Sequence, residues 1–334
     1  MPRQPVLFEL SGEHPTLPQA EALACLGAES PGFRQIGSGP GFLLVECQPE
    51  HLPSVADRLA LTHRIGQYMG SSSLERLEET AVELPLPSGS LCIRIKKVEG
   101  QYPEVDTFEL VKKLGHALSK EHPIDLTSPD LNLRVLLSDR VHFFLGQFEI
   151  DRKQFDRRKV AERPYFSPIS LHPRFARALV NLTGVHRGET VLDPFCGTGG
   201  IVLEAALLGM KAIGSDIDPL MVDGCRRNLE HFGVSGAVVE VSDIGDIHQK
   251  FGDVNAVATD PPYGRAASTN KEEINGLYDR GLIAMAESLV PGGRLGLVLP
   301  REIAAEGLEL MQVHRQRVHR SLTRYYHLFT RPLQ

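Results

Sequence analysis

From about residue 165 onward, short apolar segments that end near a polar residue alternate with longer helical segments. The apolar segments have the character of buried strands: ETVLDPF, KAIGSDI, AVVEVSD, VNAVATD and RLGLVLP. Most of them are separated by helical stretches: GIVLEAALLGM, PLMVDGCRRNLEHF and KEEINGLYDRGLIAMAESLV. Such alternation predicts a doubly wound α/β domain, a parallel sheet with helices on both faces. Open sheets of this kind bind ligands at the carboxyl ends of their strands, so the polar residues there are the first functional candidates.

The first half of the chain has shorter elements and predicts two mixed α+β units. The expected strands are 6–10, 41–47 and 91–98, followed by two strands within 131–150 around a turn at Ser138–Asp139. The expected helices are 17–28, 51–61, 73–84 and 106–120. A polar connecting segment, 151–164, separates this half from the sheet domain at 165–334.

Composition excludes several classes of protein. No apolar run approaches the length of a membrane span, and the start, MPRQPVLFEL, lacks a signal-peptide layout, so we expect a cytoplasmic protein. The five cysteines are scattered and form no CxxC pair, which supports neither a disulfide framework nor a zinc site, and no metal is expected.

Charge is distributed unevenly along the chain. The net charge of −6 argues weakly against a nucleic-acid partner if it is averaged over all 334 residues. Residues 311–334, however, hold five arginines, three histidines and no acid, and residues 151–159 are also basic. An ordinary solvated face is the commoner explanation for such runs, and a nucleic-acid surface is the alternative.

A glycine-rich loop follows the first strand of the sheet domain in VLDPFCGTGGIVLEAA. Asp193 stands at the strand end, and Gly197 and Gly199 let a ligand approach the backbone at the positive end of the next helix. The loop departs from the GxGxxG pattern at Val202, so a dinucleotide pyrophosphate fits poorly. A carboxylate before the loop also repels phosphate and suits a ligand that carries an amino group.

The next two strands also end in acids. Asp216 lies 23 residues after Asp193, near the spacing at which an acid accepts hydrogen bonds from ribose hydroxyls. Asp218 is expected to cap the helix that follows it. Asp243 could accept from an adenine amino group, and Ile244 could pack on the ring. A ribose, an adenine and an amino-acid end together describe S-adenosylmethionine.

These motifs carry a family resemblance. DPFCGTGGIVLEA, GSDID and TDPPYGR occur in the order typical of class I methyltransferases of the N2-guanine tRNA group, and RPYFSPISLHPRFARALVNL resembles the motif that precedes them. The resemblance implies a Rossmann-like, mostly parallel seven-stranded domain. It also implies a ferredoxin-like domain (1–65) and a THUMP-like RNA-binding domain (66–150) before it. The nearest members of the group are the archaeal and eukaryotic enzymes that act on guanosine 10 of tRNA.

The expected cofactor is S-adenosylmethionine and the expected macromolecular partner is tRNA. The residues expected to bind the cofactor are Asp193, Cys196, Gly197, Thr198, Gly199, Asp216, Ile217, Asp243, Ile244 and Asp260.

The segment TDPPYGR carries the expected catalytic residues. Two consecutive prolines after Asp260 form a stiff, extended strand exit. Hydrogen bonds from a purine amine to Asp260 and to the Pro261 carbonyl would localise the nitrogen lone pair and aim it at a methyl donor. Pro262 completes the turn, and Tyr263 would stack on the target base. A carboxylate can accept both N1–H and N2–H of guanine, although DPPY also occurs in adenine-N6 methyltransferases.

Several alternatives stay open. The same chemistry could act on ribosomal RNA, on DNA adenine or on a glutamine amide of a release factor, or the chain could be an inactive RNA-binding scaffold. The number of methyl groups, the nucleotide and the oligomeric state do not follow from the sequence. The apolar strand 237–243 is expected at a sheet edge, where a helix or the N-terminal half covers it or a partner adds a strand. The family resemblance implies a small zinc-binding activator protein as that partner.

Overall fold

The computed structural model describes residues 2–166, 170–262, 274–320 and 322–333. The chain divides into two compact units, Met1–Asp151 and Arg152–Gln334. The division falls where the sequence predicts the connecting segment to begin. Each unit is built around its own sheet, and the two are described separately.

Unit 1 contains one seven-stranded sheet in the order β2-β3-β1-β4-β7-β6-β5. Its strands are β1 (Gln4–Leu10), β2 (Arg34–Gly39), β3 (Phe42–Cys47), β4 (Thr62–Ser72), β5 (Leu91–Lys97), β6 (Leu131–Leu137) and β7 (Val141–Glu149). Its helices are α1 (Leu17–Glu29), α2 (Leu52–Arg58), α3 (Leu77–Val82) and α4 (Thr107–Leu118). The sequence did not predict β2 and β4, and the helix expected over 73–84 forms only over α3.

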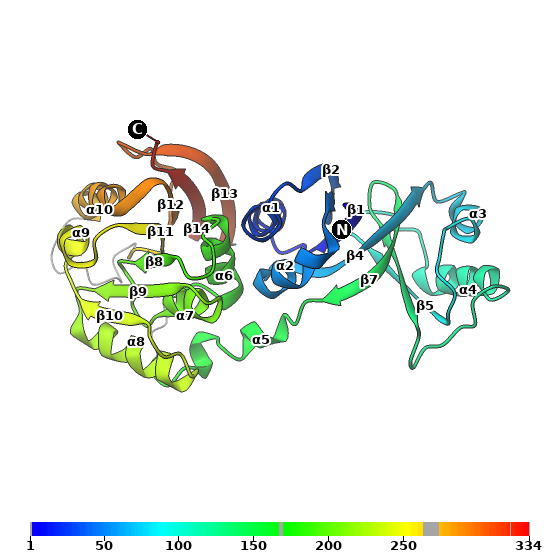
Figure 1. Cartoon of the computed structure of the whole chain (residues 1–334), viewed down its shortest axis with the longest axis horizontal. Helices are drawn as coiled ribbons and strands as arrows, with labels where there is room; N and C mark the ends of the chain where they lie inside the picture. Colours follow the sequence, from blue (N-terminus) through cyan, green and yellow to red (C-terminus); the bar gives the residue numbers. More distant parts are fainter. Residues whose placement is uncertain (1, 167–169, 263–273, 321, 334) are drawn as a thin grey trace. The chain divides into compact units, whose positions relative to one another are not determined.

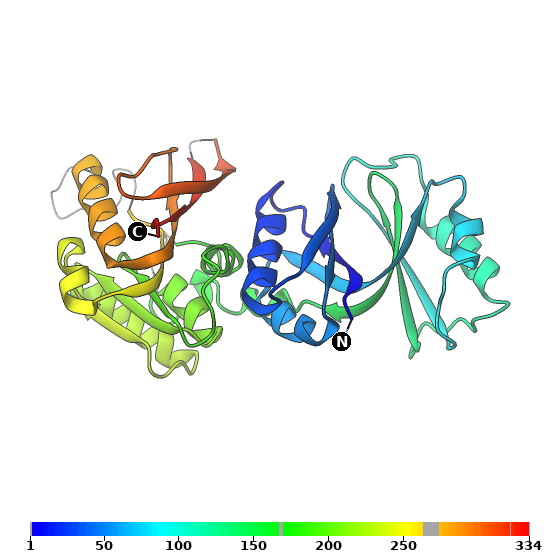
Figure 2. The ribbon, with the colours of Figure 1, turned by 45° about the horizontal axis from the view of Figure 1, so that its top comes forward.

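Two hydrophobic clusters join the helices of unit 1 to this sheet, and a third lies among its strands. Of the first two, one contains the buried side chains of α1 and α2 with those of β1 and β3, and the other contains those of α3 and α4 with β5, β6 and β7. Figure 2 shows the blue helices α1 and α2 beside one half of the sheet and the cyan helices α3 and α4 beside the other half. The expected domain boundary at 65/66 falls within β4, which pairs with both β1 and β7. The division into ferredoxin-like and THUMP-like domains stays a prediction.

Unit 2 contains the predicted doubly wound sheet, in the order β10-β9-β8-β11-β12-β14-β13. Its strands are β8 (Thr190–Asp193), β9 (Lys211–Asp216), β10 (Val238–Val241), β11 (Val254–Thr259), β12 (Leu289–Leu299), β13 (Glu309–His319) and β14 (Leu322–Thr330). Its helices are α5 (Lys153–Asp156), α6 (Pro173–Leu182), α7 (Gly200–Leu207), α8 (Pro219–His231), α9 (Ile247–Phe251) and α10 (Ile274–Ser288). The first five strands of that order run parallel, and β14 is antiparallel to β12 and β13. The mostly parallel seven-stranded sheet is confirmed, and most of the basic C-terminal run forms the hairpin β13–β14.

Helices cover both faces of this sheet. α6, α7 and α8 lie on one face, while α9 and α10 lie on the other (Figure 1). The side chains of α10 pack with those of β11 and β12 in a hydrophobic cluster on their face of the sheet. Within the described residues, no helix combines the length and the apolar character that crossing a membrane requires.

The segment expected as a connection between domains contributes to the core of unit 2. Phe155 on α5 is fully buried, and the guanidinium of Arg158 lies 4.9 Å from the centre of its ring. Arg158 donates two hydrogen bonds to Glu204 on α7, of 2.7 and 3.2 Å, and Arg177 forms an ion pair with the same carboxylate at 2.8 Å. Removing one member of such a buried network leaves an uncompensated charge, which typically costs about 3–5 kcal/mol. The segment is therefore a structural part of unit 2 as well as a connection.

Candidate active site

Four predicted acids lie at or just beyond the carboxyl ends of neighbouring strands. Asp193 is the last residue of β8, Asp216 is the last residue of β9, and Asp260 follows β11 directly. Asp243 comes two residues after β10 ends. Because β8 pairs in parallel with both β9 and β11, these ends lie along one edge of the sheet. This is the edge at which doubly wound sheets bind ligands.

The carboxyl group of Asp193 is buried and partly satisfied within the protein. The hydroxyl of Thr259 donates to its Oδ1 at 2.6 Å, and the backbone N–H of Phe195 donates to the same atom at 3.3 Å. Burial raises the pKa of Asp193 to about 7, against these two hydrogen bonds. A bound ammonium group would favour the charged form of this carboxyl.

The glycine loop is tied to the end of β9. Gly199 has a φ of 84° and begins α7 from the left-handed region, which glycine adopts without strain. The N–H of Cys196 donates to the Ser215 carbonyl at 2.8 Å, and the N–H of Gly197 donates to Asp216 Oδ2 at 2.9 Å. Asp216 Oδ1 accepts from the N–H of Asp218 at 3.0 Å. Asp216 therefore fixes the loop while its carboxylate, whose pKa burial raises, keeps further acceptor lone pairs.

Asp218 and Asp243 have separate tasks. Asp218 caps α8 by accepting from the N–H of Leu220 at 2.9 Å, as predicted. Asp243 accepts from the N–H of Gly245 at 2.8 Å and from the guanidinium of Arg280 on α10. The hydrogen bond from Arg280 lowers the pKa of Asp243, so this carboxylate is charged and its position is fixed.

The two isoleucines that were expected near the adenine differ in exposure. Ile217 is 44% exposed beside Asp216, whereas Ile244 is 4% exposed and packs in the hydrophobic cluster under α10. Ile217 therefore offers more surface to a ring than Ile244 does.

Asp260 holds an acceptor that the protein does not use. Its Oδ1 is buried and has no hydrogen-bond partner among the residues that the structure describes. Burial raises the pKa of Asp260 to about 7, and the charge of Arg324 on β14 acts in the opposite direction. Buried hydrogen-bond acceptors in folded proteins are nearly always paired. We therefore expect the unpaired oxygen of Asp260, at a strand end, to accept a hydrogen bond from a ligand.

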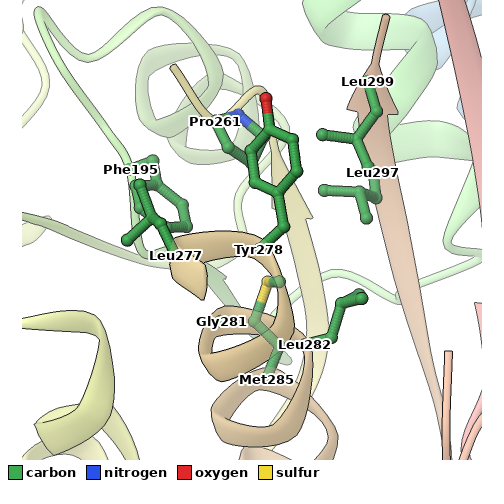
Figure 3. Close-up of a pocket in the computed structure, with 9 residues that line it drawn as sticks. All are labelled: Phe195, Pro261, Leu277, Tyr278, Gly281, Leu282, Met285, Leu297 and Leu299. Carbon is green, nitrogen blue, oxygen red and sulfur yellow. The ribbon is translucent and has the colours of Figure 1, made fainter. Parts of the chain in front are cut away.

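The prolines after Asp260 are supported from α10. Tyr278 is almost fully buried, and its hydroxyl donates to the Pro262 carbonyl at 2.9 Å. Figure 3 shows its ring beside Pro261 in a small apolar cavity that Leu277, Leu297 and other side chains line. The cavity has a volume of about 10 Å³, enough for one water at most, so it is packing space behind the turn. Tyr263, the expected stacking residue, lies outside the described residues.

Sequence reasoning missed the residues that hold the loop from a distance. Asn228 on α8 is buried, and its amide nitrogen donates to the Thr198 carbonyl at 2.9 Å and to the Tyr165 carbonyl at 3.0 Å. Its amide oxygen accepts from the Tyr165 N–H at 2.9 Å. One side chain thus joins α8, the glycine loop and the segment before α6. No local sequence pattern reports such a contact across 63 residues.

Arg163, from the same preceding segment, is also buried against the loop. Its Nε donates to the Arg158 carbonyl at 3.0 Å, and its Nη1 lies 3.5 Å from the Thr198 hydroxyl. Its Nη2 is buried and has no hydrogen-bond partner within the described part of the chain. The position of Arg163 at the start of the RPYF motif was a signal, but the motif was used only as a mark of family.

The sheet order, the glycine loop and the acids at the strand ends define a class I S-adenosylmethionine-dependent methyltransferase. The family described as RMKL-like, methyltransferase domain matches residues 161–326. Along nearly the whole chain, the sequence is similar to two archaeal proteins named tRNA (guanine(10)-N2)-dimethyltransferase, and the chain belongs to their family of tRNA guanine-N2 methyltransferases.

The coverage of these matches is high. The protein of Methanothermobacter thermautotrophicus is 36% identical over 336 residues, 96% of this chain and 98% of the relative. That of Pyrococcus abyssi is 33% identical over 333 residues with the same coverage. The crystal structure of TrmN from Thermus thermophilus aligns with a TM-score of 0.58 at 24% identity, covering 98% of this chain and 100% of that one, and so shares the fold.

Proposed function

We propose that this protein transfers a methyl group to the exocyclic N2 amine of guanosine 10 in tRNA. The observation that carries the proposal is the unpaired, buried Oδ1 of Asp260 at the carboxyl end of β11. The names of the two archaeal relatives support tRNA as the substrate and position 10 as the nucleotide.

The residues at the strand ends fit S-adenosylmethionine, which supplies the methyl group when bound. The desolvated carboxyl of Asp193 suits its ammonium, Asp216 suits the ribose hydroxyls, and the charged Asp243 suits the adenine amine. Gly197 and Thr198 lie between Asp193 and Asp216 along the chain, in the loop just before α7.

Asp260 would hold and activate the target amine. The N2 lone pair of guanine is delocalised into the ring, and a hydrogen bond to Oδ1 would draw it back toward the nitrogen. Methyl transfer leaves that nitrogen with one proton too many, and a carboxylate with a pKa of about 7 can accept it at neutral pH. Tyr278 would act indirectly, because its hydrogen bond to Pro262 fixes the turn on which Asp260 sits.

The test uses the purified chain, radiolabelled methyl donor and transcripts of tRNA with guanosine or adenosine at position 10. We expect methylation of the guanosine transcript only, at a position located by mass spectrometry. In Asp260→Asn the rate of methyl transfer should fall by at least about 100-fold, the scale of one essential transition-state contact. Asp253→Asn is the matched control, because Asp253 is exposed just before β11 while Asp260 stands just after it. Label in ribosomal RNA or DNA instead of tRNA, or full activity of Asp260→Asn, would contradict the proposal.

The predicted activator partner has a specific obstacle. β10 is the edge strand, as expected, but two outward carbonyls of its backbone are already bound. The guanidinium of Arg226 donates to the Val239 carbonyl, with Nε at 3.1 Å, and the Lys250 ammonium donates to the Val241 carbonyl at 2.7 Å. A partner strand would have to displace both donors. The bound carbonyls therefore oppose strand addition here, and we infer that the chain is active without an activator protein. The methylation assay, run on the chain without any partner, tests whether an activator is needed. The cytoplasmic location stays a prediction.

A further inference from the structure

A cavity of about 680 Å³ lies in unit 1, and residues of β1, β2 and β5 line it together with the loops that follow these strands. Its volume falls within the range of about 300–1,000 Å³ that is usual for sites that bind small molecules. No residue of the candidate active site is among those that line it. The cavity is therefore a second candidate site, and the chemistry of its walls indicates what it binds.

Two buried polar side chains of the cavity wall have unused hydrogen-bonding groups. Glu9 on β1 is 1% exposed, and Ser11, just after β1, is 3% exposed. Neither Glu9 Oε1 nor the Ser11 hydroxyl has a hydrogen-bond partner among the described residues. Buried polar groups are nearly always paired, so we expect a ligand in this cavity to complete both. Glu9 requires a donor, whereas the hydroxyl can donate or accept.

Glu9 lies among more positive charge than it neutralises. Its carboxylate oxygens lie 3.5 Å from Lys96 Nζ, 3.8 Å from Arg64 Nη1 and 3.7 Å from Arg134 Nη2. Arg64 has a second partner, Glu149, at 2.7 Å. Three cations thus share two carboxylates, and this group keeps an excess of positive charge.

Two lysines of β5 bring positive charge to the cavity wall. Lys96 is the cation of the Glu9 group that lines the cavity, and its side chain is partly exposed, so a ligand can reach its ammonium. Lys97 also lines the cavity, and it donates to the Val105 carbonyl at 2.9 Å, which fixes its ammonium without neutralising it. Besides Glu9, the wall contains one further acid, Glu99, which is exposed. We therefore expect an anion at Lys96.

The cavity also has an apolar part, to which Leu10, Val98 and Leu136 contribute. A ligand that matches the whole wall therefore has an anion for the lysines, a hydrogen-bond donor for Glu9 and an apolar surface for these side chains. A nucleotide combines the three in its phosphate, its ribose hydroxyls and its base. Inorganic phosphate offers only the anion.

We propose that this cavity binds a nucleoside phosphate, with its phosphate at Lys96 and a hydroxyl or amine donor at Glu9. The Lys96 ammonium and the Ser11 hydroxyl would donate to phosphate oxygens, and the base would pack on the apolar part of the wall. A free nucleotide and a nucleotide unit of an RNA chain present the same groups, so both are sources of such a ligand. Binding here would not depend on which nucleotide of tRNA the protein methylates.

Calorimetry on the full chain tests the cavity with the 5′-monophosphates of adenosine, guanosine, cytidine and uridine. Excess S-adenosylmethionine is present, so that the candidate cofactor site of unit 2 is filled. At least one nucleotide should bind at least about tenfold more tightly than its nucleoside or inorganic phosphate, because each of these lacks part of the ligand. Lys96→Gln should weaken nucleotide binding by at least about tenfold, the lower end for a hydrogen bond to a charged group.

Ser11→Ala separates the loss of a ligand contact from the loss of structure. Binding should weaken by about 3- to 10-fold, whereas urea unfolding should show no loss of stability, because the hydroxyl has no partner within the described protein. This variant keeps the test decisive if Lys96→Gln fails to fold. Lys113→Gln is the matched control, since Lys113 is exposed on α4, is not among the residues that line the cavity, and should keep the full affinity.

A single-stranded RNA of six nucleotides distinguishes the two sources of the ligand. RNA that binds at least about tenfold more tightly than any mononucleotide, and that loses affinity in Lys96→Gln and Ser11→Ala, would identify RNA as the source. Equal or weaker binding of RNA would identify a free nucleotide. The inference would be overturned if no mononucleotide and no RNA bound, or if neither variant changed their binding. Inorganic phosphate that binds as tightly as the nucleotides would also overturn it, because the cavity would then recognise only an anion.

Discussion

Two carboxyl groups of the site, Asp193 and Asp260, are held near half-protonation at neutral pH by burial. Such groups are costly for folding, because the unfolded chain ionises them freely near pH 4. The same desolvation favours binding of a ligand with hydrogen-bond donors. An ammonium at Asp193 and an amine at Asp260 would supply hydrogen bonds that these carboxyl groups do not receive from the protein. Function and stability therefore oppose each other at these residues.

Asp260→Asn should gain stability relative to the wild type as pH rises. The folded protein binds the Asp260 proton more tightly than the unfolded chain, so this carboxyl favours folding fully below about pH 4 and loses that contribution as pH rises through about 7. An asparagine does not titrate. The difference in unfolding free energy should therefore shift toward the variant by about 1–3 kcal/mol between pH 5 and pH 8.

Urea unfolding of the wild type and of Asp260→Asn at the two pH values measures this shift. A pH-independent difference for Asp260→Asn would contradict the assigned pKa. In the wild type, methyl transfer should also fall as pH drops below about 7, because protonation removes the acceptor.

Among the elements, α8 supports the glycine loop through Asn228, a role that its sequence does not indicate. Asn228 makes three hydrogen bonds to backbone groups of Thr198 and Tyr165. Asn228→Ala should lower the unfolding free energy by about 2–4 kcal/mol, since buried backbone groups lose their partner. It should also weaken binding of S-adenosylmethionine, because the glycine loop loses its support.

The control for Asn228 is the neighbouring residue on the same helix. Arg227 is exposed in an ion pair with Asp223, so Arg227→Ala should change stability by less than about 0.5 kcal/mol. Denaturant unfolding with and without S-adenosylmethionine measures both effects. Equal losses in the two variants would show that Asn228 has no special role.

The strand–helix alternation predicted the elements of unit 2 well, because apolar runs bounded by turn residues are a local signal. β4 was missed, since THRIGQYMGSS lacks alternating apolar residues, and β13 was missed because ELMQVHRQRVH is dominated by polar side chains. The strand-end acids of the site were predictable from their position. Asn228 and Arg280 were not, since each acts through contacts with residues distant in the sequence, and for Arg163 the only signal was its place in the RPYF motif.

At the scale of the whole molecule, the candidate catalytic and cofactor-binding residues are confined to one of the two units. All of them lie in unit 2, and unit 1 has its own sheet and its own hydrophobic clusters. Units with separate cores are expected to fold separately. If unit 1 is the RNA-binding part, unit 2 alone should still bind the methyl donor but should bind tRNA more weakly than the full chain does.

A fragment of residues 152–334 should bind S-adenosylmethionine within about threefold of the full chain, while its affinity for tRNA should fall by at least about tenfold. The salt dependence of tRNA binding should also become less steep, because fewer phosphates are contacted. Calorimetry and filter binding between 50 and 200 mM salt, with circular dichroism to verify folding, measure these quantities. Unchanged tRNA affinity and salt slope would remove the RNA-binding role of unit 1.

The bound carbonyls of β10 bear on how the protein behaves when it is concentrated. An open sheet edge is a template on which further copies can add strands and grow into aggregates. Here that protection depends on two cationic side chains, Arg226 and Lys250, and Lys250 also pairs with Glu240 at 2.9 Å. Acetylation of Lys250 would remove its charge, and with it the ion pair to Glu240 and the charge-assisted hydrogen bond to the Val241 carbonyl. One chemical modification, far from any catalytic group, would thereby leave Arg226 as the single cationic side chain bound to a β10 carbonyl and weaken the protection of this edge against self-association.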